Sequence, residues 1–585
     1  MIKLVGNNSL EKERILKLCK EVVSPNEIFA SCFYGPGIYG YGDEESDINV
    51  MLVISRYPPK ISTFSKQMNG VNLSILAIDK KVFESDVGHG EFGELVAEII
   101  TQPFQPWMKP KYLEKMELRM KKRFVLELLK NVILQYPELS MELLINPDYF
   151  MYEVMRRRAR LFPPIMHNLV RVFRGKARKK NIDFIMKGYR KALRRLEREN
   201  FVALSDGYVK INKKFIESTK VQSRKFSTIF NSIQKTLLSY IKGISSKILT
   251  AFLHGQMPLA ENSLQKDEVE LLKQLEETEK YLLMPTPLGP VPLSDKTDIK
   301  DFVLKTVPSR TVLKISIEEM GGVLNSIFLL HIKKNNTTKR VVVKKFEDWL
   351  GLKWFPLALW TLGTKSFAVL STTRLKREYS INQFLRNKGF VVPRILYVSL
   401  KRRLIFEDFV EGEKISEIVK NIIISSPNEN MGNSVEIIEK VGEELAKVHA
   451  LDIALGDCKP ENMLVTNDER FCFLDLEQAT RNGNQPWDIA EFLYYSGHYI
   501  LPTHSDKAAK KIASSFIEGY LRAGGKRENI KKAASAKYTK VFSIFTLPNI
   551  ILSMASICRK MAEDDRNKQV ARMKLDAPKD QLIFT

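Results

Sequence analysis

The residues best suited to chemistry lie close together in segment 455–477, which reads Leu-Gly-Asp-Cys-Lys-Pro-Glu-Asn-Met-Leu-Val, a short polar turn and Phe-Leu-Asp-Leu-Glu. Asp457 can accept the proton of an attacking hydroxyl, and Asn462, five positions later, offers an oxygen ligand to magnesium. Asp475 supplies a second oxygen ligand on the next predicted hairpin. One base and two magnesium ligands in this order favour phosphoryl transfer, in which a protein mainly positions the nucleophile and neutralises phosphate charge.

Such a site also needs a cation for the phosphates, held by a strand and a helix. The β-branched run 340–346, Arg-Val-Val-Val-Lys-Lys-Phe, predicts a strand that ends in two lysines. Strand alternation puts only one of them on the side of the site, and the sequence does not fix the register. We favour Lys344, and Lys345 stays the alternative. Apolar residues at helical spacing in 374–385 predict a helix on which Glu378 is the best partner for the lysine.

Two further stretches would complete a nucleotide site. Gly321 and Gly322 separate two predicted strands, and a glycine pair lets backbone amides approach phosphates closely, although such a pair is an unspecific signal. Residues 404–412, Leu-Ile-Phe-Glu-Asp-Phe-Val-Glu-Gly, predict a further strand that runs into a turn.

The order of these elements resembles the catalytic core of the protein-kinase-like phosphotransferases over about residues 300–585. The resemblance implies ATP and Mg²⁺ as cofactors, Asp457 as the base, Lys459 at the γ-phosphate, and Asn462 and Asp475 as metal ligands. It also implies that segment 404–412 is the hinge strand whose backbone holds the adenine. The residues it assigns to the nucleotide are Gly321, Gly322, Lys344, Glu378 and Glu407.

Three departures from typical protein kinases indicate an atypical kinase. Those kinases have His-Arg before the base, Gly after Asp-Phe and a long activation segment, whereas this chain has Leu-Gly at 455–456, Glu477, and only ten residues between Glu477 and Asp488. Gly-Asp ahead of the Lys and Asn is similar to the KEOPS-complex kinase, the RIO kinases, and the aminoglycoside and lipopolysaccharide-core phosphotransferases. Asp-Leu-Glu at 475–477 is closer to small-molecule phosphotransferases. Ten residues are too few to build a peptide platform, so we expect extended peptides to be poor substrates.

The amino-terminal end carries a second, damaged motif. Residues 28–55 predict a strand, a glycine-rich turn and a second strand, which resembles the minimal nucleotidyltransferase fold of the DNA polymerase β superfamily. Pro36, Asn49 and Asn72 stand where that family has a Ser and two metal-binding carboxylates, and only Asp47 remains. Neutral amides bind magnesium weakly, so the resemblance implies a domain that no longer transfers nucleotides. An ordinary α/β domain whose glycines form a tight turn is the alternative.

Positive charge concentrates in the middle of the chain. The formal net charge is +24, and residues 151–230 contain 22 Lys and Arg against 6 Asp and Glu. Helical patterns in this window lead into two alternating strands about Asp206-Gly207, an order that resembles the winged helix-turn-helix that RIO kinases carry. Such charge attracts phosphates, which favours RNA or DNA as a partner. The alternative is a set of solvated helix faces.

The predicted fold class is α+β multidomain. The domains are a degenerate nucleotidyltransferase-like α/β domain at 1–105, a basic helical and winged-helix-like domain at 106–225, a helical segment with a Pro-rich linker at 226–299, and a two-lobed protein-kinase-like domain at 300–585. Five cysteines without metal-ligand spacing, and the lack of a secretory signal or a convincing membrane span, predict a cytoplasmic protein.

Three functions follow as hypotheses. The leading one is an atypical Ser/Thr protein kinase with an unknown protein substrate, acting in an RNA- or ribonucleoprotein-linked setting. The second is a kinase of a sugar or lipid alcohol. The third is a catalytically inactive nucleic-acid-binding scaffold, against which the intact Lys344, Asp457, Asn462 and Asp475 argue.

Overall fold

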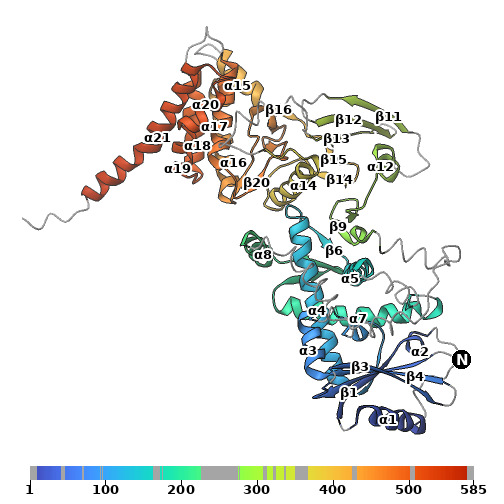
Figure 1. The fold of residues 1–585 in the computed structure, drawn as a ribbon. Helices are drawn as coiled ribbons and strands as arrows, with labels where there is room; N and C mark the ends of the chain where they lie inside the picture. Colours follow the sequence, from blue (N-terminus) through green and yellow to red (C-terminus); the bar gives the residue numbers. More distant parts are fainter. Residues whose placement is uncertain are drawn as a thin grey trace, which may run out of the picture. The chain divides into compact units, whose positions relative to one another are not determined.

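The computed structural model describes residues 9–24, 26–40, 47–58, 60–68, 71–91, 94, 97–161, 172–173, 175–225, 275, 277–306, 313–320, 325–334, 337–348, 367–424, 431–500 and 507–575. The chain forms two compact units (Figure 1), Met1–Met284 with Pro292–Ser294, and Pro285–Val291 with Asp295–Thr585. Both units mix helices with sheets, so the α+β character is confirmed. The finer division into four domains stays a prediction, and residues 226–274 lie outside the described part.

The amino-terminal unit begins with a five-stranded sheet of order β3-β4-β2-β1-β5. Its strands are β1 (Glu27–Tyr34), β2 (Ile48–Ser55), β3 (Ile61–Met68), β4 (Val71–Asp79) and β5 (Gln105–Met108). Helix α1 (Ser9–Val23) packs on one face, while α3 (Lys80–His89) and α4 (Pro110–Gln135) pack on the other. Apolar residues of the central strand β2 are buried on both faces, which explains why its sequence is a nearly continuous apolar run.

The strand, turn and strand predicted for residues 28–55 are confirmed. Strands β1 and β2 are antiparallel, and the short helix α2 (Pro36–Tyr39) lies in the turn between them. Gly35 has a φ of +87°, and an added Cβ would lie 2.3 Å from the side-chain nitrogen of Asn49. Asn49 pairs with Ser74 of the parallel strand β4, and Asn72 accepts a hydrogen bond from Ser65 on β3. The nucleotidyltransferase resemblance itself stays a prediction.

The rest of this unit combines helices with a second five-stranded sheet, β10-β9-β6-β8-β7. Its elements include β6 (Leu144–Ile145), α5 (Asp148–Leu161), α7 (Arg178–Arg198), β7 (Val202–Ser205), β8 (Tyr208–Ile211), α8 (Lys213–Lys225), β9 (Leu282–Met284) and β10 (Val291–Pro292). The predicted hairpin is confirmed, because β7 and β8 are antiparallel around Asp206 and Gly207, whose φ angles are +52° and +81°. A winged-helix identity is not established by this order.

Helix α7 shows how the basic window folds. Its apolar residues recur at helical spacing and are buried, so most of its Lys and Arg side chains point to solvent. It packs along α4, where the buried Lys121 donates to Glu117 at 2.6 Å and to the Ile185 carbonyl at 2.9 Å. The helix therefore presents one charged face while its other face joins the core.

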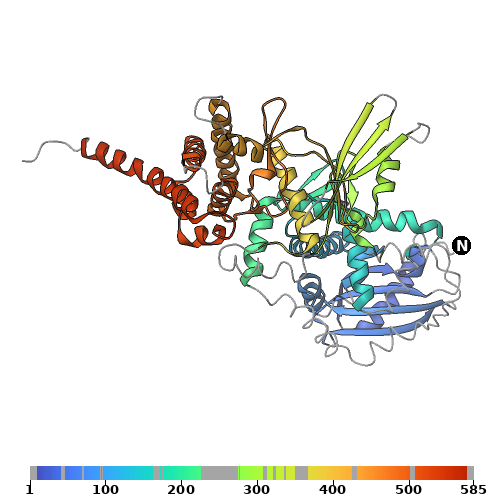
Figure 2. The ribbon, with the colours of Figure 1, turned by 90° about the horizontal axis from the view of Figure 1, so that it is seen from above.

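The small lobe of the carboxyl-terminal unit is an antiparallel sheet of order β11-β12-β13-β15-β14. Its elements are α12 (Ile299–Thr306), β11 (Leu313–Glu319), β12 (Asn325–Lys334), β13 (Thr337–Phe346), α14 (Ser371–Asn387), β14 (Ile395–Ser399) and β15 (Leu404–Asp408), and their strands run side by side in Figure 2. Val341 and Val343 of β13 are fully buried beside Phe302 of α12. Alternation along β13 therefore turns Lys344 to the other face of the sheet.

The large lobe is mostly helical and surrounds one apolar core. Its elements are α15 (Ile415–Ile424), α16 (Met431–Ala450), β18 (Met463–Thr466), β19 (Phe471–Phe473), β20 (Thr480–Arg481), α17 (Gln485–Ser496), α18 (Lys507–Arg522), α19 (Arg527–Ala533), α20 (Ala536–Phe542) and α21 (Pro548–Leu575). Segment 455–462, where the candidate base lies, precedes β18. Within the described residues, none of the helices has the length and apolar character that a membrane span requires.

Candidate active site and a second pocket

Lys344 lies where the sequence predicted it, facing α14. Its ammonium is 3.0 Å from Glu378 Oε1, 3.2 Å from Glu407 Oε1 and 3.1 Å from the Leu474 carbonyl oxygen. Burial by itself would lower the pKa of Lys344, but the two carboxylates outweigh burial and hold that pKa well above its ordinary value. Lys345, the alternative, has a half-exposed side chain that contacts Glu347.

Glu378 joins the lysine to the segment that carries Asp475. It is fully buried on α14, and its second oxygen accepts a hydrogen bond of 2.6 Å from the Leu476 backbone N–H. Burial raises the pKa of Glu378, while the charge of Lys344 opposes that rise. The helix therefore fixes both the strand lysine and the backbone next to Asp475.

Asp457 is held by two neighbours from its own loop. Lys459 Nζ is 2.7 Å from Asp457 Oδ1, and Asn462 Nδ2 donates to Asp457 Oδ2 at 3.1 Å and to its backbone carbonyl at 3.0 Å. Burial would lower the pKa of Lys459, but Asp457 and then Glu491 raise it. The carboxylate of Asp457 is thus kept in one orientation, as a general base requires.

Asn462 and Asp475 fit a magnesium ion through their donor atoms. Asn462 donates through its side-chain nitrogen, which leaves its side-chain oxygen Oδ1 for a cation. The Leu474 backbone N–H donates to the backbone carbonyl of Asn462 at 2.9 Å and so ties together the segments that carry Asn462 and Asp475. Among the described residues no three His, Cys, Asp or Glu side chains are grouped to hold a metal by themselves. Magnesium bound here would need nucleotide oxygens as well, as is usual for this ion.

Two carboxylates that the sequence analysis did not select hold the loop that carries Asp457. Asp488 accepts from the Leu455 and Gly456 backbone N–H groups at 2.6 and 2.7 Å, and Glu491 accepts from the Cys458 N–H at 2.7 Å. Both lie on the buried helix α17, and Gly456 has a φ of +75°. Two acidic residues three positions apart in an otherwise apolar helix were the available signal. They act as positioning residues for Asp457.

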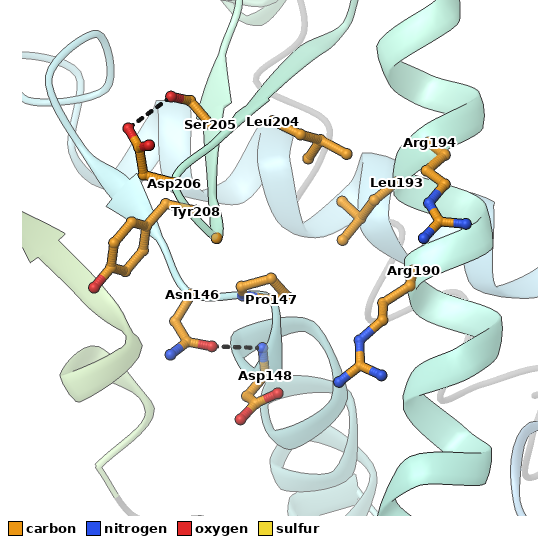
Figure 3. A pocket seen from close by; sticks show the side chains of 11 residues that line it. Asn146, Pro147, Asp148, Arg190, Leu193, Arg194, Leu204, Ser205, Asp206 and Tyr208 are labelled. Carbon is orange, nitrogen blue, oxygen red and sulfur yellow. Dashed lines mark hydrogen bonds between the residues drawn. The ribbon is translucent and has the colours of Figure 1, made fainter.

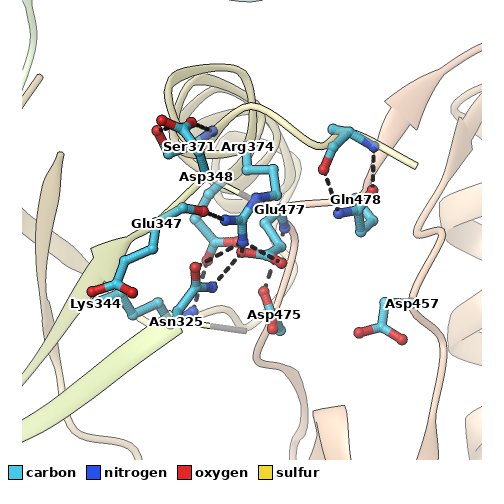
Figure 4. A network of polar contacts seen from close by, with 12 residues as sticks. Asn325, Lys344, Glu347, Asp348, Ser371, Arg374, Asp457, Asp475, Glu477 and Gln478 are labelled. Atoms are coloured by element: carbon cyan, nitrogen blue, oxygen red, sulfur yellow. Dashed lines mark hydrogen bonds and ion pairs between the residues drawn. The ribbon is translucent and has the colours of Figure 1, made fainter. Parts of the chain in front are cut away.

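Glu477, which replaces the usual glycine, sits in a buried polar clamp (Figure 4). Its oxygens accept from Arg374 Nη1 at 2.9 and 3.0 Å and from Asn325 Nδ2 at 2.6 Å. Arg374 also donates to Asn325 Oδ1 and to the Glu347 carbonyl. The clamp joins β12, α14 and the segment that carries Asp475, so the motif that departs from typical kinases has a defined structural role.

We expect Arg374→Met to lower the free energy of unfolding by about 3–5 kcal/mol, because it leaves the Glu477 charge buried and unpaired. The double variant Arg374→Met with Glu477→Met should lower the free energy of unfolding much less, since neither charge then remains. Chemical denaturation followed through the unfolding of the carboxyl-terminal unit measures both. The exposed pair Lys532–Glu528 provides the control, and Lys532→Met should leave the midpoint of denaturation nearly unchanged. A double variant as unstable as the single one would contradict the clamp.

The segment after the clamp is short. Gln478 bonds the backbone N–H and carbonyl of Ala368 at 2.9 and 3.2 Å, and β20 leads within a few residues into α17. Seven residues, 478–484, separate Glu477 from α17. The chain thus passes from Glu477 to the buried helix α17 within a few residues, in line with the short segment counted in the sequence.

A second candidate site is a pocket of about 470 Å³ in the amino-terminal unit (Figure 3). Arg190 and Arg194, one turn apart on α7, line this pocket together with Asp148 at the start of α5 and Asp206 in the β7–β8 turn. Burial raises the pKa of Asp148 at this end, and the charge of Arg190 lowers it. Asn146 Oδ1 accepts from the Asp148 backbone N–H at 3.0 Å. Two guanidinium groups beside a hairpin can bind phosphate oxygens.

Most of the site residues predicted from the sequence lie in the described part of one unit. All seven described residues belong to the carboxyl-terminal unit: Lys344, Glu378, Glu407, Asp457, Lys459, Asn462 and Asp475. The contacts above link Lys344, Glu378 and Glu407 into one group and Asp457, Lys459 and Asn462 into a second. Glu407 lies on β15, and its side chain contacts Lys344. Gly321 and Gly322 lie outside the described residues, so their role stays a prediction.

Known proteins resemble this part of the chain. Residues 331–493 match the model of the lipopolysaccharide kinase (Kdo/WaaP) family. A stretch of 166 residues is 29% identical to a probable serine/threonine-protein kinase BUD32 homolog of Archaeoglobus fulgidus and covers 28% of this chain and 74% of that relative.

Two other relatives share less of their length. EKC/KEOPS complex subunit bud32 of Dictyostelium discoideum is 24% identical over 25% of this chain and 58% of its own length. A 3-deoxy-D-manno-octulosonic acid kinase of Vibrio vulnificus is 25% identical over 21% of this chain and 50% of its own length. These likenesses leave most of this chain unmatched. Together with the fold, they support an atypical protein-kinase-like fold for the carboxyl-terminal unit, similar to that of kinase-type phosphotransferases.

Proposed function

We propose that the protein is an ATP- and magnesium-dependent phosphotransferase that acts on Ser/Thr hydroxyls of a folded protein. The observation that carries this proposal is the grouping of Lys344, Glu378, Asp457, Asn462 and Asp475 on the fixed elements described above. Lys344 is paired with Glu378 and Asp457 with Asn462, and Glu378 holds the backbone next to Asp475.

The proposed chemistry assigns one task to each side chain. Lys344 binds phosphate oxygens of the nucleotide, and Asn462 and Asp475 would hold magnesium, which neutralises charge on the phosphates. Asp457 orients the acceptor hydroxyl and takes its proton, while Lys459, 2.7 Å from Asp457, lies ready for the transferred group. Asp488 and Glu491 keep the loop backbone in place, so Asp457 does not have to be reorganised for the reaction.

A folded acceptor is favoured over an extended peptide. Only residues 478–484 separate the metal-binding motif from α17, which leaves little chain to line up a peptide strand. The acceptor would have to dock elsewhere and present its hydroxyl to Asp457 by tethering. The basic window 151–230 is one available surface, and it favours an RNA- or ribonucleoprotein-linked setting.

A small-molecule alcohol kinase is the second candidate. It is favoured by Asp-Leu-Glu at 475–477 and by the likeness to the 3-deoxy-D-manno-octulosonic acid kinase. Its acceptor would be a sugar or lipid alcohol that needs no peptide platform. The amino-terminal residues 1–105, with Asp47 as the remaining acidic residue of the motif, are proposed to have no nucleotidyltransferase activity in either case.

The acceptor assay separates these candidates. With γ-labelled ATP and magnesium, we expect the full chain to label itself and folded protein acceptors much faster than short basic peptides, because docking raises the effective concentration of the hydroxyl. Asp457→Asn serves as the inactive control. Saturable labelling of a sugar or lipid alcohol would promote the second candidate, and efficient labelling of short peptides would refute docking. No labelling above the control would refute the proposed function.

A further inference from the structure

Three protein oxygens already surround the ammonium group of Lys344 in the described part of the chain. A lysine carries three donors and no acceptor, and three protein oxygens lie within bonding distance, from Glu378, Glu407 and the Leu474 carbonyl. A phosphate oxygen can reach this ammonium only if one of the three acceptors withdraws. The question is therefore which of them can move.

Two of the three acceptors are anchored. Glu378 is fully buried and also accepts from the Leu476 backbone N–H at 2.6 Å. Leu474 is also fixed by its backbone N–H, which donates to the backbone carbonyl of Asn462 at 2.9 Å. Moving either of them would displace the segment that carries Asp475. Both are thus poor candidates for release.

Glu407 has no comparable anchor. Its Oε1 contacts Lys344 at 3.2 Å, and its Oε2 is buried without a hydrogen-bond partner among the described residues. Val342 of β13 pairs with Glu407 and Lys344 with Ile405, so the two charged side chains lie diagonally on one face of the sheet. The other charges that act on Glu407 are those of Asp475 and Asp408, and both repel it. Lys344 is the attraction that holds it.

We propose that Glu407 is an internal competitor of the nucleotide, which occupies Lys344 in the empty site and gives way to a phosphate group. The inference rests on the proposed function, because it takes Lys344 to be the phosphate-binding lysine. It assigns Glu407 a specific effect, which is to weaken the binding of phosphate-bearing nucleotides. The cost arises because the displaced carboxylate loses its cation and stays buried beside the incoming anion.

Glu407→Gln removes the charge and keeps the shape of the side chain. Because a hydrogen bond to a charged group is worth more than a neutral one, we expect MgATP and MgADP to bind about 10–100-fold more tightly to this variant. Adenosine, which has no phosphate to compete for Lys344, should bind equally to both proteins. This contrast separates competition for Lys344 from any effect on the binding of the adenine ring.

Isothermal titration of the full chain with MgATP, MgADP and adenosine tests the inference. Glu413→Gln on the exposed strand β16 (Gly412–Lys414) is the matched control and should leave every affinity unchanged. Glu378→Gln should instead weaken MgATP binding, since it releases the anchor of Lys344. If a lowered midpoint of thermal unfolding shows that Glu407→Gln is poorly folded, Glu407→Met, which also removes the charge, repeats the test.

The outcomes distinguish this inference from the function on which it rests. MgATP affinity that is unchanged or weaker in Glu407→Gln and Glu407→Met overturns the competitor role and leaves the phosphotransferase proposal standing. An equal gain in the affinity for adenosine also overturns it, because the effect would then arise at the adenine ring and not at the phosphates. Failure of the wild-type protein and of both variants to bind any nucleotide overturns the proposed function and this inference together.

Discussion

Asp457→Asn and Asp475→Asn should each lower the rate of phosphoryl transfer by at least about 10²-fold, the scale on which single transition-state contacts act. The Asp457 substitution would keep the shape of the side chain, but its amide could not take the proton of the acceptor hydroxyl. The Asp475 substitution would remove the one carboxylate that, with Asn462, is positioned to bind magnesium. Both changes leave the buried clamp at Glu477 in place, so their effects should be chemical and not due to unfolding.

Binding measurements make this prediction sharper. Asp457→Asn should retain its affinity for MgATP, because Asp457 faces the acceptor. Asp475→Asn should lose the magnesium dependence of ATP binding. Asp468→Asn, at the exposed turn between β18 and β19, changes the same functional group and should leave rate and binding unaltered. Full activity in both active-site variants would discard this site assignment.

Local patterns were enough to predict the elements that carry the site. The β-branched run ending at Phe346 and the apolar spacing after Arg374 predicted a strand and a helix, and the structure contains β13 and α14 there. Register could not be fixed in advance, because Lys344 and Lys345 are adjacent at the end of the same valine run. Burial of Val341 and Val343 against Phe302 decides it. Lys344 therefore follows from packing and not from the motif.

Contacts between distant segments could not be predicted in this way. The clamp of Asn325, Arg374 and Glu477 joins residues 49 to 152 positions apart, and no periodicity connects them. Arg374 did lie four positions before Glu378 on the same predicted helix, which was a signal for a shared face. The contact between Glu407 and Lys344 is likewise a product of strand pairing, since β15 joins β13 across the insertion of α14 and β14.

Affinity for RNA or duplex DNA should fall steeply with salt if the basic window binds nucleic acid. Contact with about 6–10 phosphates predicts a loss of about 10³–10⁵-fold between roughly 50 and 200 mM salt, because binding releases condensed counterions. Arg190 and Arg194 are the best-placed residues for such binding, since both line the pocket beside the β7–β8 turn. Acidic side chains lie near these basic residues as well, Asp148 near Arg190, Glu114 near Lys191 and Glu199 near Arg195.

Fluorescence anisotropy of a labelled RNA or duplex DNA across a salt series measures this slope. Arg190→Glu with Arg194→Glu should weaken binding and reduce the slope by about two, one unit for each phosphate that is no longer neutralised. Lys511→Glu with Lys531→Glu makes the same change in net charge on exposed positions of the carboxyl-terminal unit, and it should alter the slope little. An equal effect of the two double variants would mean that net charge alone attracts the nucleic acid. Binding that ignores salt in the unmodified protein would mean that α7 merely presents a solvated face.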